Sequence, residues 1–458
     1  MSPNSSMPSS SRLPSYDGRR HTSNYGNHRG STASINSSQW TEHHYTLSDA
    51  RDPPWATLMV RSRAPLPTHL PSTFEGEDIT GEILLDLTRE DSSIKGVVVS
   101  IIGQITTSAI DMHPFLTLRQ ELWSADMGDP GQRRGAPFNG KLLGRYRWPF
   151  TFKIPPYVEF AGSSGSNETF RVPPSFSERM TRVHIQYQLI AVIRRGKFRI
   201  DNQLSTVFSF TPFIHPAPFT EARQEAYRHG HPIPGPDQDP EGWESLTSVD
   251  VGGTVFSTRA VDAKCRLSLA KPLSYTRGTV IPCSLCIECS DAQALDLLSM
   301  PQAIDIRLLR HISKVTTEVV SKSTGKSKYA VDFEQTAQEI RSAVWWLSYD
   351  DSYRRVLCGE IHLPKDLKPN CRIGKFDLHV RSIPSDCSLS YTVEMFPMKA
   401  IAFSSHETTA AALLVQPVEI VTAYSAGPRP RTYSPSLPPG YNDASSSTRP
   451  SSEYSFRV

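Results

Sequence analysis

The sequence predicts an all-β fold in which two antiparallel β-sandwiches follow one another between disordered N- and C-terminal tails. Apolar residues alternate with polar ones at a period of two in many segments, which is the pattern of strands with one buried face. Turn-forming residues recur between these short segments. Helical periodicity, in contrast, is nearly absent.

Composition divides the 458 residues into five segments. A polar N-terminal tail is expected over 1–54 and a first strand-rich domain over 55–220. A linker rich in Pro and Gly follows over 221–258, then a second strand-rich domain over 259–425 and a polar C-terminal tail over 426–458. Each strand-rich segment is long enough to bury roughly 70% of its unfolded-chain surface and to stand as a domain.

The alternating runs of the first domain give its expected core-facing residues. These are Ile83, Leu85 and Leu87, then Val97, Val99 and Ile101, then Tyr146, Trp148, Phe150, Phe152 and Ile154, and finally Val183, Ile185, Tyr187, Leu189, Ala191 and Ile193. Pro149 lies within the third run and has no N–H for a ladder hydrogen bond, so this strand is expected at the edge of a sheet.

The second domain shows the same alternation. Its expected core-facing residues are Cys265, Leu267 and Leu269, then Ile281, Cys283, Leu285 and Ile287, then Ile304, Ile306 and Leu308, then Phe376, Leu378 and Val380, and finally Tyr391, Val393 and Met395. A turn is expected at Thr276-Arg277-Gly278. Residues 291–298 fit a short helix or a loop nearly equally well.

The seven cysteines are odd in number and scattered, which indicates reduced thiols and no disulfide framework. Cys283, Cys286 and Cys289 have a spacing of three that resembles a zinc motif. They lie, however, in an apolar stretch expected to be a strand, where Cys283 and Cys289 would point to one face and Cys286 to the other. We therefore expect no metal and no other cofactor.

Charge and hydropathy limit the partners and the location. The formal net charge of +3, from 49 basic and 46 acidic residues, is too balanced for a protein that binds nucleic acid by neutralising phosphates. Residues 1–50 lack the apolar core of a signal peptide, and no run of 18 apolar residues occurs. A soluble cytoplasmic protein with only peripheral membrane association is expected.

No catalytic constellation emerges from the sequence, and we expect a protein that is not an enzyme. The nucleophile-elbow pattern G-x-S-x-G does not occur. Gly325-Lys326-Ser327 resembles the end of a phosphate-binding loop, but Val320 stands where that loop needs glycine. The paired histidines His43 and His44 fall in the N-terminal tail, where they are expected to be solvated.

The C-terminal tail contains Leu437-Pro438-Pro439-Gly440-Tyr441, a Pro-Pro-x-Tyr motif. Such a segment favours polyproline II and docks into the aromatic groove of WW domains. Pro438 and Pro439 would lie across the paired aromatic residues of that groove, and Tyr441 would enter the adjacent pocket. Phosphorylation of Ser434, which precedes Pro435, or of Tyr441 offers a way to tune this contact.

Several of these segments, in this order, resemble the arrestin-like proteins, and among them the fungal-type α-arrestins that carry such motifs. The matching segments are Phe74–Ile83, Ile94–Gly103, Trp148–Pro155, Pro173–Phe176 with Val183–Leu189, and, in the second domain, Tyr275–Pro282 and Ile304–Arg310. The resemblance covers roughly 75–400 and implies two tandem arrestin-type, immunoglobulin-like sandwiches. The chain departs from the family in its longer linker and in having one Pro-Pro-x-Tyr motif, where α-arrestins often have two or more.

The resemblance implies an adaptor that links the cytoplasmic regions of membrane transporters or receptors to a WW-domain ubiquitin ligase of the HECT type. Cargo ubiquitination, endocytosis and sorting would follow, with the adaptor cytoplasmic and transiently at the plasma membrane or endosomes. One alternative is an arrestin-fold trafficking scaffold, similar to retromer subunits, that acts without ubiquitin. Another is a β-sandwich hydrolase or carbohydrate-binding protein.

Overall fold

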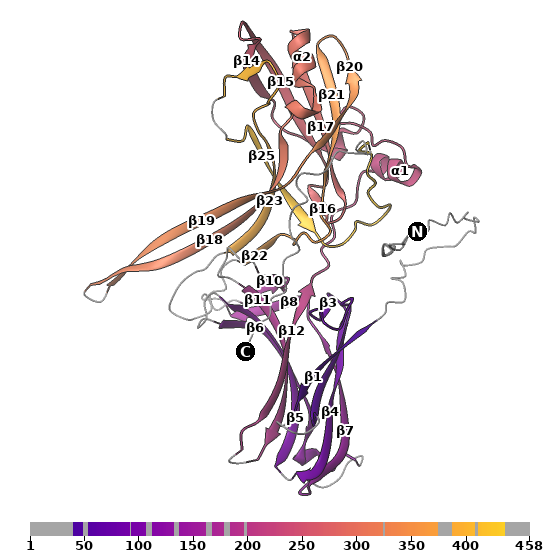
Figure 1. The fold of residues 1–458 in the computed structure, drawn as a ribbon, viewed down its shortest axis with the longest axis vertical. Helices are drawn as coiled ribbons and strands as arrows, with labels where there is room; N and C mark the ends of the chain where they lie inside the picture. The colour runs from indigo at the N-terminus through magenta and orange to yellow at the C-terminus, as the bar shows by residue number, and fades with distance from the viewer. Residues whose placement is uncertain are drawn as a thin grey trace, which may run out of the picture. The chain divides into compact units, whose positions relative to one another are not determined.

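The computed structural model describes residues 40–48, 54–91, 93–106, 112–131, 137–161, 167–177, 184–196, 199–323, 326–373, 387–407 and 411–435. These residues form mostly β-strands in several antiparallel sheets, with two α-helices in the described part of the chain. The predicted all-β class is therefore confirmed, and Figure 1 shows the sheets in chain order from indigo to yellow.

The first half of the chain forms two sheets. One has the order β1-β2-β4-β7, with bounds Thr41–Leu47, Ala56–Ser62, Asp78–Asp91 and Leu142–Lys153. The other has the order β3-β12-β11-β5-β6, with bounds Ser72–Phe74, Asn202–Thr211, His184–Arg195, Ile94–Thr106 and Met112–Ser124, and β10, Phe176–Ser177, pairs with β11. Strands β8, Tyr157–Ala161, and β9, Asn167–Arg171, form a separate hairpin, and a 3-10 turn spans Ala125–Met127.

Aromatic residues connect these two sheets across a shared core. Trp123 of β6 stacks on Trp148 of β7 with ring centroids 6.0 Å apart. Trp148, Phe150 and Phe152 are buried while the intervening residues of β7 are exposed, as the alternation predicts. Strand β7 is the last strand of its sheet, so the edge position expected from Pro149 is also confirmed.

The expected N-terminal tail is wrong for its last residues, because Thr41–Leu47 form strand β1 and pair with β2. His43, expected to be solvated, is 1% exposed. Its Nε2 lies 2.8 Å from the Ser62 hydroxyl and its Nδ1 lies 3.1 Å from the Pro67 carbonyl. The polar composition of this segment hid a strand whose buried residue is a hydrogen-bonded histidine.

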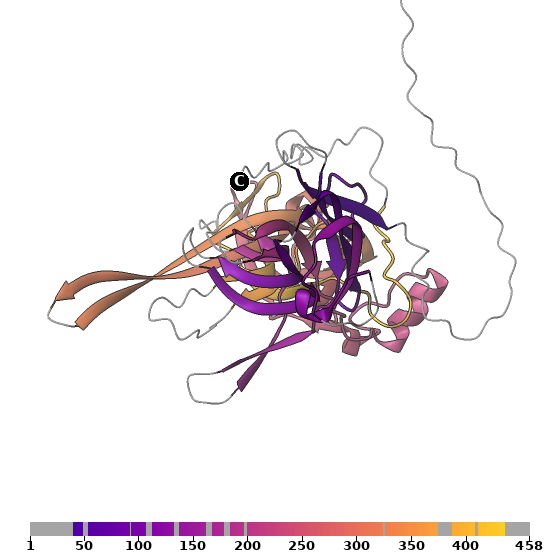
Figure 2. The same cartoon turned by 90° about the horizontal axis from the view of Figure 1, so that it is seen from below.

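The second half of the chain also forms two sheets. One has the order β20-β21-β17-β15-β14-β24, with bounds Val344–Asp350, Arg354–His362, Val280–Cys289, Arg259–Ala270, Val249–Val255 and Phe403–Ser405, and β13, Trp243–Ser245, pairs with β15. The other has the order β16-β25-β23-β18-β19, with bounds Ser274–Thr276, Leu414–Val421, Cys387–Met395, Ile306–Ser323 and Lys326–Ser342, and β22, Cys371–Ile373, pairs with β23. Figure 2 shows that β18 and β19 extend as a long hairpin beyond their shorter neighbours.

The two halves share a strand order, which β20 and β24 extend at the two ends of one sheet in the second half. The path β1-β2-β4-β7 in the first half corresponds to β14-β15-β17-β21 in the second. The path β3-β12-β11-β5-β6, with β10 on β11, corresponds to β16-β25-β23-β18-β19, with β22 on β23. In both halves the short strand that pairs with the last long strand does so in parallel.

The predicted core residues of the second half behave as the alternation requires wherever they are described. Cys265, Leu267, Leu269, Ile281, Leu285, Ile287, Ile306, Leu308, Tyr391, Val393 and Met395 are all fully buried. Phe376, Leu378 and Val380, and Val183 of the first half, lie outside the described residues. Residues Ala292–Leu298 form helix α2, with the Asp291 side chain accepting from the Ala294 N–H, followed by a 3-10 turn at Pro301–Ala303.

The expected linker over 221–258 differs most from the structure. It contains helix α1, Glu221–His229, a 3-10 turn at Pro240–Gly242, and strands β13 and β14. Strand β14 pairs with β15 and β24 and therefore belongs to the second half. Its Val249-Asp250-Val251-Gly252-Gly253 sequence contains two glycines, which a strand tolerates where another chain segment approaches closely.

Candidate functional site at the C-terminal strap

The predicted binding residues Pro438, Pro439 and Tyr441 lie outside the described residues. The described chain continues to Pro435, and we call residues 426–435 the C-terminal strap. The strap contacts helix α1 and strand β21 through side chains and backbone. The disordered tail expected from residue 426 is thus wrong for these ten positions, which lead directly to the motif.

Helix α1 presents one buried face to the second half of the protein. The Thr220 side chain caps its N-terminus by accepting from the Arg223 N–H, and Gly230 ends it in the left-handed conformation. Arg223, Ala226 and Tyr227, spaced three and four residues apart, are buried. The helix is short and mostly polar, so this apolar spacing is too weak a signal to separate it from a linker.

Arg223 fixes α1 to the turn that precedes β13 and to the residue that follows β15. It is 1% exposed, and its guanidinium donates to the backbone carbonyls of Lys271 and Gly242, while Nε has no hydrogen-bond partner within the described residues. Burial lowers the pKa of Arg223, although the nearby Tyr227 and Asp239 oppose the shift. Within the described residues, the buried guanidinium is therefore held by two backbone carbonyls and not by a hydrogen-bonded carboxylate.

Tyr433 of the strap stacks on Tyr227 of α1. The ring centroids are 6.4 Å apart and the ring planes differ by 10°. Burial raises the pKa of Tyr227 to about 12 and also raises the pKa of Tyr433. The Tyr433 hydroxyl is buried without a hydrogen-bond partner in the described part of the chain, so its contribution to the contact is the ring.

Glu360 of β21 holds the next part of the strap. Its carboxylate accepts from the Thr432 hydroxyl at 2.6 Å, from the Tyr433 N–H at 2.7 Å and from the Ser434 N–H at 3.1 Å. We call Glu360 with these three residues the Glu360 clasp. Hydrogen bonds to a carboxylate are charge-assisted, and each is stronger than a bond between neutral groups.

Glu360 faces away from the core, on the same side of β21 as His362 and opposite Ile361. The Glu360 side chain is nevertheless only 3% exposed, because the strap covers it, whereas that of His362 is 46% exposed. The sequence pattern of β21 places Glu360 in solvent, and no local signal could have shown that a segment more than seventy residues later encloses it.

Ser434 lies at the outer end of the Glu360 clasp. Its hydroxyl is 3.0 Å from Nε2 of His362 and 3.1 Å from the Thr432 hydroxyl. The strap therefore holds its hydroxyl-bearing residues against one carboxylate and one imidazole. This arrangement holds the strap segment in place through hydrogen bonds.

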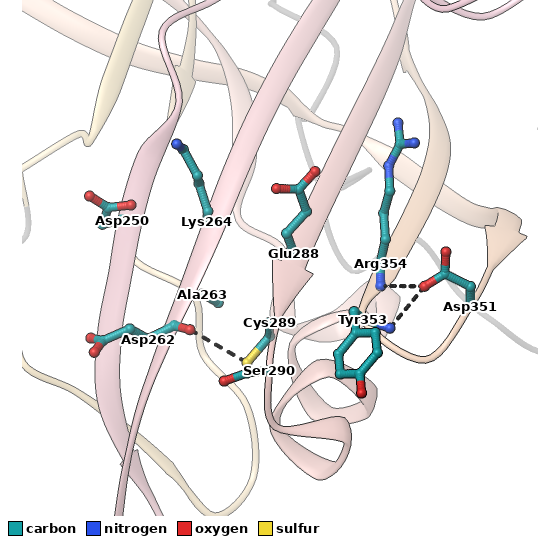
Figure 3. A pocket seen from close by; sticks show the side chains of 10 residues that line it. All are labelled: Asp250, Asp262, Ala263, Lys264, Glu288, Cys289, Ser290, Asp351, Tyr353 and Arg354. Carbon is teal, nitrogen blue, oxygen red and sulfur yellow. Dashed lines mark hydrogen bonds between the residues drawn. The ribbon is translucent and has the colours of Figure 1, made fainter.

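A second location is a shallow depression of about 530 Å³ on the sheet of the second half (Figure 3). Asp250, Lys264, Glu288 and Arg354 stand opposite one another on the successive strands β14, β15, β17 and β21. Figure 3 shows Lys264 between Asp250 and Glu288. Opposite charges at directly paired positions stabilise a sheet, so this row is explained by cross-strand pairing.

The three cysteines whose spacing resembles a zinc motif do not share one face of their strand. Cys283 and Cys289 are buried, and Cys286 points to the other face of β17, as predicted. Over the described ranges, no group of three or more His, Cys, Asp or Glu side chains could hold a metal ion. Neither helix of the described structure is long and apolar enough to cross a membrane.

No protein-family model matches this chain, and no curated protein matches it significantly.

Proposed function

We propose that this protein is an arrestin-type adaptor that recruits a WW-domain ubiquitin ligase of the HECT type through Pro438, Pro439 and Tyr441. Its cargo would be the cytoplasmic regions of membrane transporters or receptors, met at the plasma membrane or endosomes from a cytoplasmic pool. The shared strand order of the two halves supports a tandem arrestin-type fold. The motifs that resemble the arrestin-like family lie on strands of both halves.

The observation that carries the proposal is the short distance along the chain between the docked strap and the Pro-Pro-x-Tyr motif. Ser434 is held by the Glu360 clasp, and only residues 435–437 separate it from Pro438. Three residues span at most about 11 Å, so a docked strap keeps the motif close to the second half of the protein. A bound ligase would thereby be held beside a folded body that carries cargo.

Binding of isolated WW domains to the full chain tests the first step. The Tyr441→Ala variant removes the side chain that would fill the WW pocket, and we expect affinity to fall at least tenfold. Tyr454→Ala, a tyrosine outside the motif in the same tail, is the matched control and should bind as the parent does. Equal binding by the parent and Tyr441→Ala would show that the motif is inert.

Cargo turnover in cells separates the adaptor from the scaffold that acts without ubiquitin. Deleting residues 436–458 removes the motif and leaves the C-terminal strap in place. The adaptor requires slower cargo turnover after this deletion. Unchanged turnover, together with retained cargo binding, would favour the trafficking scaffold.

A further inference from the structure

We propose that Ser434 is a phosphorylation site and that its modification releases the C-terminal strap from the Glu360 clasp. The release concerns residues 426–435 and β21 and does not require the proposed function. Its consequence for ligase access does rest on that function.

Ser434 is accessible enough to be modified when the strap opens. It is partly exposed in the closed state, and Pro435 directly follows it, the sequence that proline-directed serine/threonine kinases select. No strand pairing holds the strap, because its backbone N–H groups at Tyr433 and Ser434 donate to the Glu360 side chain. A segment held by side chains at the end of a domain opens locally at low cost.

The modification is an ordinary phosphoryl transfer. The Ser434 hydroxyl oxygen attacks the γ-phosphorus of ATP, the bond from that phosphorus to the bridging oxygen breaks, and ADP leaves. The hydroxyl proton passes to the catalytic base of the kinase. The product has about two more negative charges and three further acceptor oxygens at Ser434.

The Glu360 clasp cannot accommodate those charges without losing its bonds. The Ser434 hydroxyl is one hydrogen bond from the Thr432 hydroxyl, which itself donates to the Glu360 carboxylate. A phosphate there would add acceptors beside a carboxylate that is 3% exposed and already uses the available donors. Like charges repel, and the burial of Glu360 leaves its carboxylate little water to screen that repulsion.

His362 is the group that could oppose this repulsion. It contacts the Ser434 hydroxyl, lies 3.7 Å from Glu360 and is 46% exposed, so water competes for it. Arg431 precedes the Glu360 clasp, but its guanidinium lies toward the Arg228 carbonyl at the end of α1. One exposed imidazole shared with Glu360 is too little to hold a dianionic phosphate in place.

Release would lengthen the tether of the Pro-Pro-x-Tyr motif. With the strap docked, three residues separate the held Ser434 from Pro438. With the strap free, residues 426–437 form the tether, and its maximum span rises from about 11 Å to about 43 Å. Phosphorylation would thus change how far a bound ligase can reach.

Amide hydrogen exchange on the full chain tests the release. Protein carrying phosphoserine at 434, introduced during synthesis, should exchange the Tyr433 and Ser434 amides at least tenfold faster than the unmodified protein. Ser434→Ala, which keeps the backbone N–H and adds no charge, should change this exchange much less. Unchanged or slower exchange in the phosphorylated protein, for example through pairing with His362, would overturn the proposal.

The Glu360→Gln variant identifies the repelling group. It removes the negative charge of the Glu360 clasp, so adding phosphoserine at 434 should accelerate strap exchange less than in the parent. An equal acceleration in both backgrounds would contradict the role of Glu360. In a separate arm, a proline-directed kinase with ATP should phosphorylate the parent at Ser434, and failure to do so would overturn the modification site.

These measurements stand apart from the WW-domain experiment. Strap exchange reports only on residues 426–435 and needs no ligase. Equal WW-domain binding by the parent and Tyr441→Ala would remove the proposed function while leaving the strap result intact. Unaltered strap exchange would remove this inference while leaving WW binding intact.

Discussion

At the scale of single residues, two buried tyrosines hold equivalent places in the two halves. Tyr187 on β11 donates to the Pro173 carbonyl at 2.5 Å, and Tyr391 on β23 donates to the Lys368 carbonyl at 2.8 Å. Both tyrosines are fully buried. In each half the accepting carbonyl lies three residues before the short strand that pairs beside the tyrosine. Each hydroxyl therefore ties an irregular segment to a central strand.

Replacing either tyrosine with phenylalanine should lower the free energy of unfolding by a similar amount. Tyr187→Phe and Tyr391→Phe leave a carbonyl without its donor, and we expect each to lower the free energy of unfolding by about 1–2 kcal/mol. Chemical denaturation measures this loss. Tyr157→Phe, at a position 54% exposed, is the control and should be neutral. A neutral Tyr187→Phe would show that water replaces the lost donor.

His43 makes stability depend on pH. The Pro67 carbonyl can only accept, so Nδ1 of His43 donates to it and Nε2 accepts from the Ser62 hydroxyl. Burial lowers the pKa of His43 below its ordinary value of 6.5, which the Pro67 contact opposes and His44 reinforces. The unfolded chain therefore takes up this proton first as the pH falls.

The free energy of unfolding should consequently decrease as the pH drops through 6.5 toward the lower pKa of folded His43. The slope from this one group is less than about 1.4 kcal/mol per pH unit. His43→Gln cannot titrate and should lose less stability over this range, whereas His44→Gln, which removes only the smallest cause of the shift, should keep most of the parent's pH dependence. Parallel pH profiles for the parent and His43→Gln would contradict the assignment.

At the scale of elements, Gly76 and Gly81 of the segment Phe74–Ile83, which resembles the arrestin-like family, are required for different physical reasons. Gly76 lies in the turn between β3 and β4 with φ of +84°, and Gly278 occupies the same place between β16 and β17 with φ of +79°. Gly81 is different, because a Cβ there would collide with the Met59 carbonyl and the Phe150 ring. One glycine is required by the backbone, and the other by packing between strands.

Alanine substitutions should separate these two causes. Gly76→Ala meets no atom within 4 Å, so only backbone strain remains, at about 1–2 kcal/mol. Gly81→Ala forces β2 or Phe150 to move and should cost more, up to about 3 kcal/mol. Gly235→Ala, with open space and no left-handed backbone, is the control and should stay within about 0.5 kcal/mol. The reverse order of losses in denaturation would refute this explanation.

At the scale of the whole molecule, the second half begins well before the boundary that composition predicts. Strand β14 completes the sheet between β15 and β24, and Trp243 and Tyr227 are buried. Residues 212–217 also run beside 422–425, joined by the bonds of Ile214 to Thr422 and Ala423. The segment between the halves is therefore part of the structure of the second half.

Two fragments test this boundary. A fragment of residues 213–435 keeps α1, β13 and β14, and we expect cooperative thermal unfolding. A fragment of residues 259–435 loses several buried side chains worth about 1.5–3 kcal/mol each, a sum comparable with the stability of a whole domain. It should aggregate or melt without cooperativity in circular dichroism. Equal melting temperatures of the two fragments would instead show that residues 221–258 are a linker, as composition predicts.

The sequence by itself determined the all-β class, the buried faces of β4, β5, β7, β11, β15, β17, β18 and β23, the edge position of β7 and the opposed cysteines of β17. These properties follow from periodicity and from the missing N–H of proline, which act within a few residues. It also supplied the Pro-Pro-x-Tyr motif, whose structure lies outside the described residues.

The tertiary structure alone decided the burial of His43, the fixing of α1 by Arg223 and the enclosure of Glu360 by the C-terminal strap. Each of these depends on polar groups that find hydrogen-bond partners far away in the chain. Polar residues in irregular segments look solvated in sequence, because the carbonyl or amide that satisfies them is chosen only when distant segments meet.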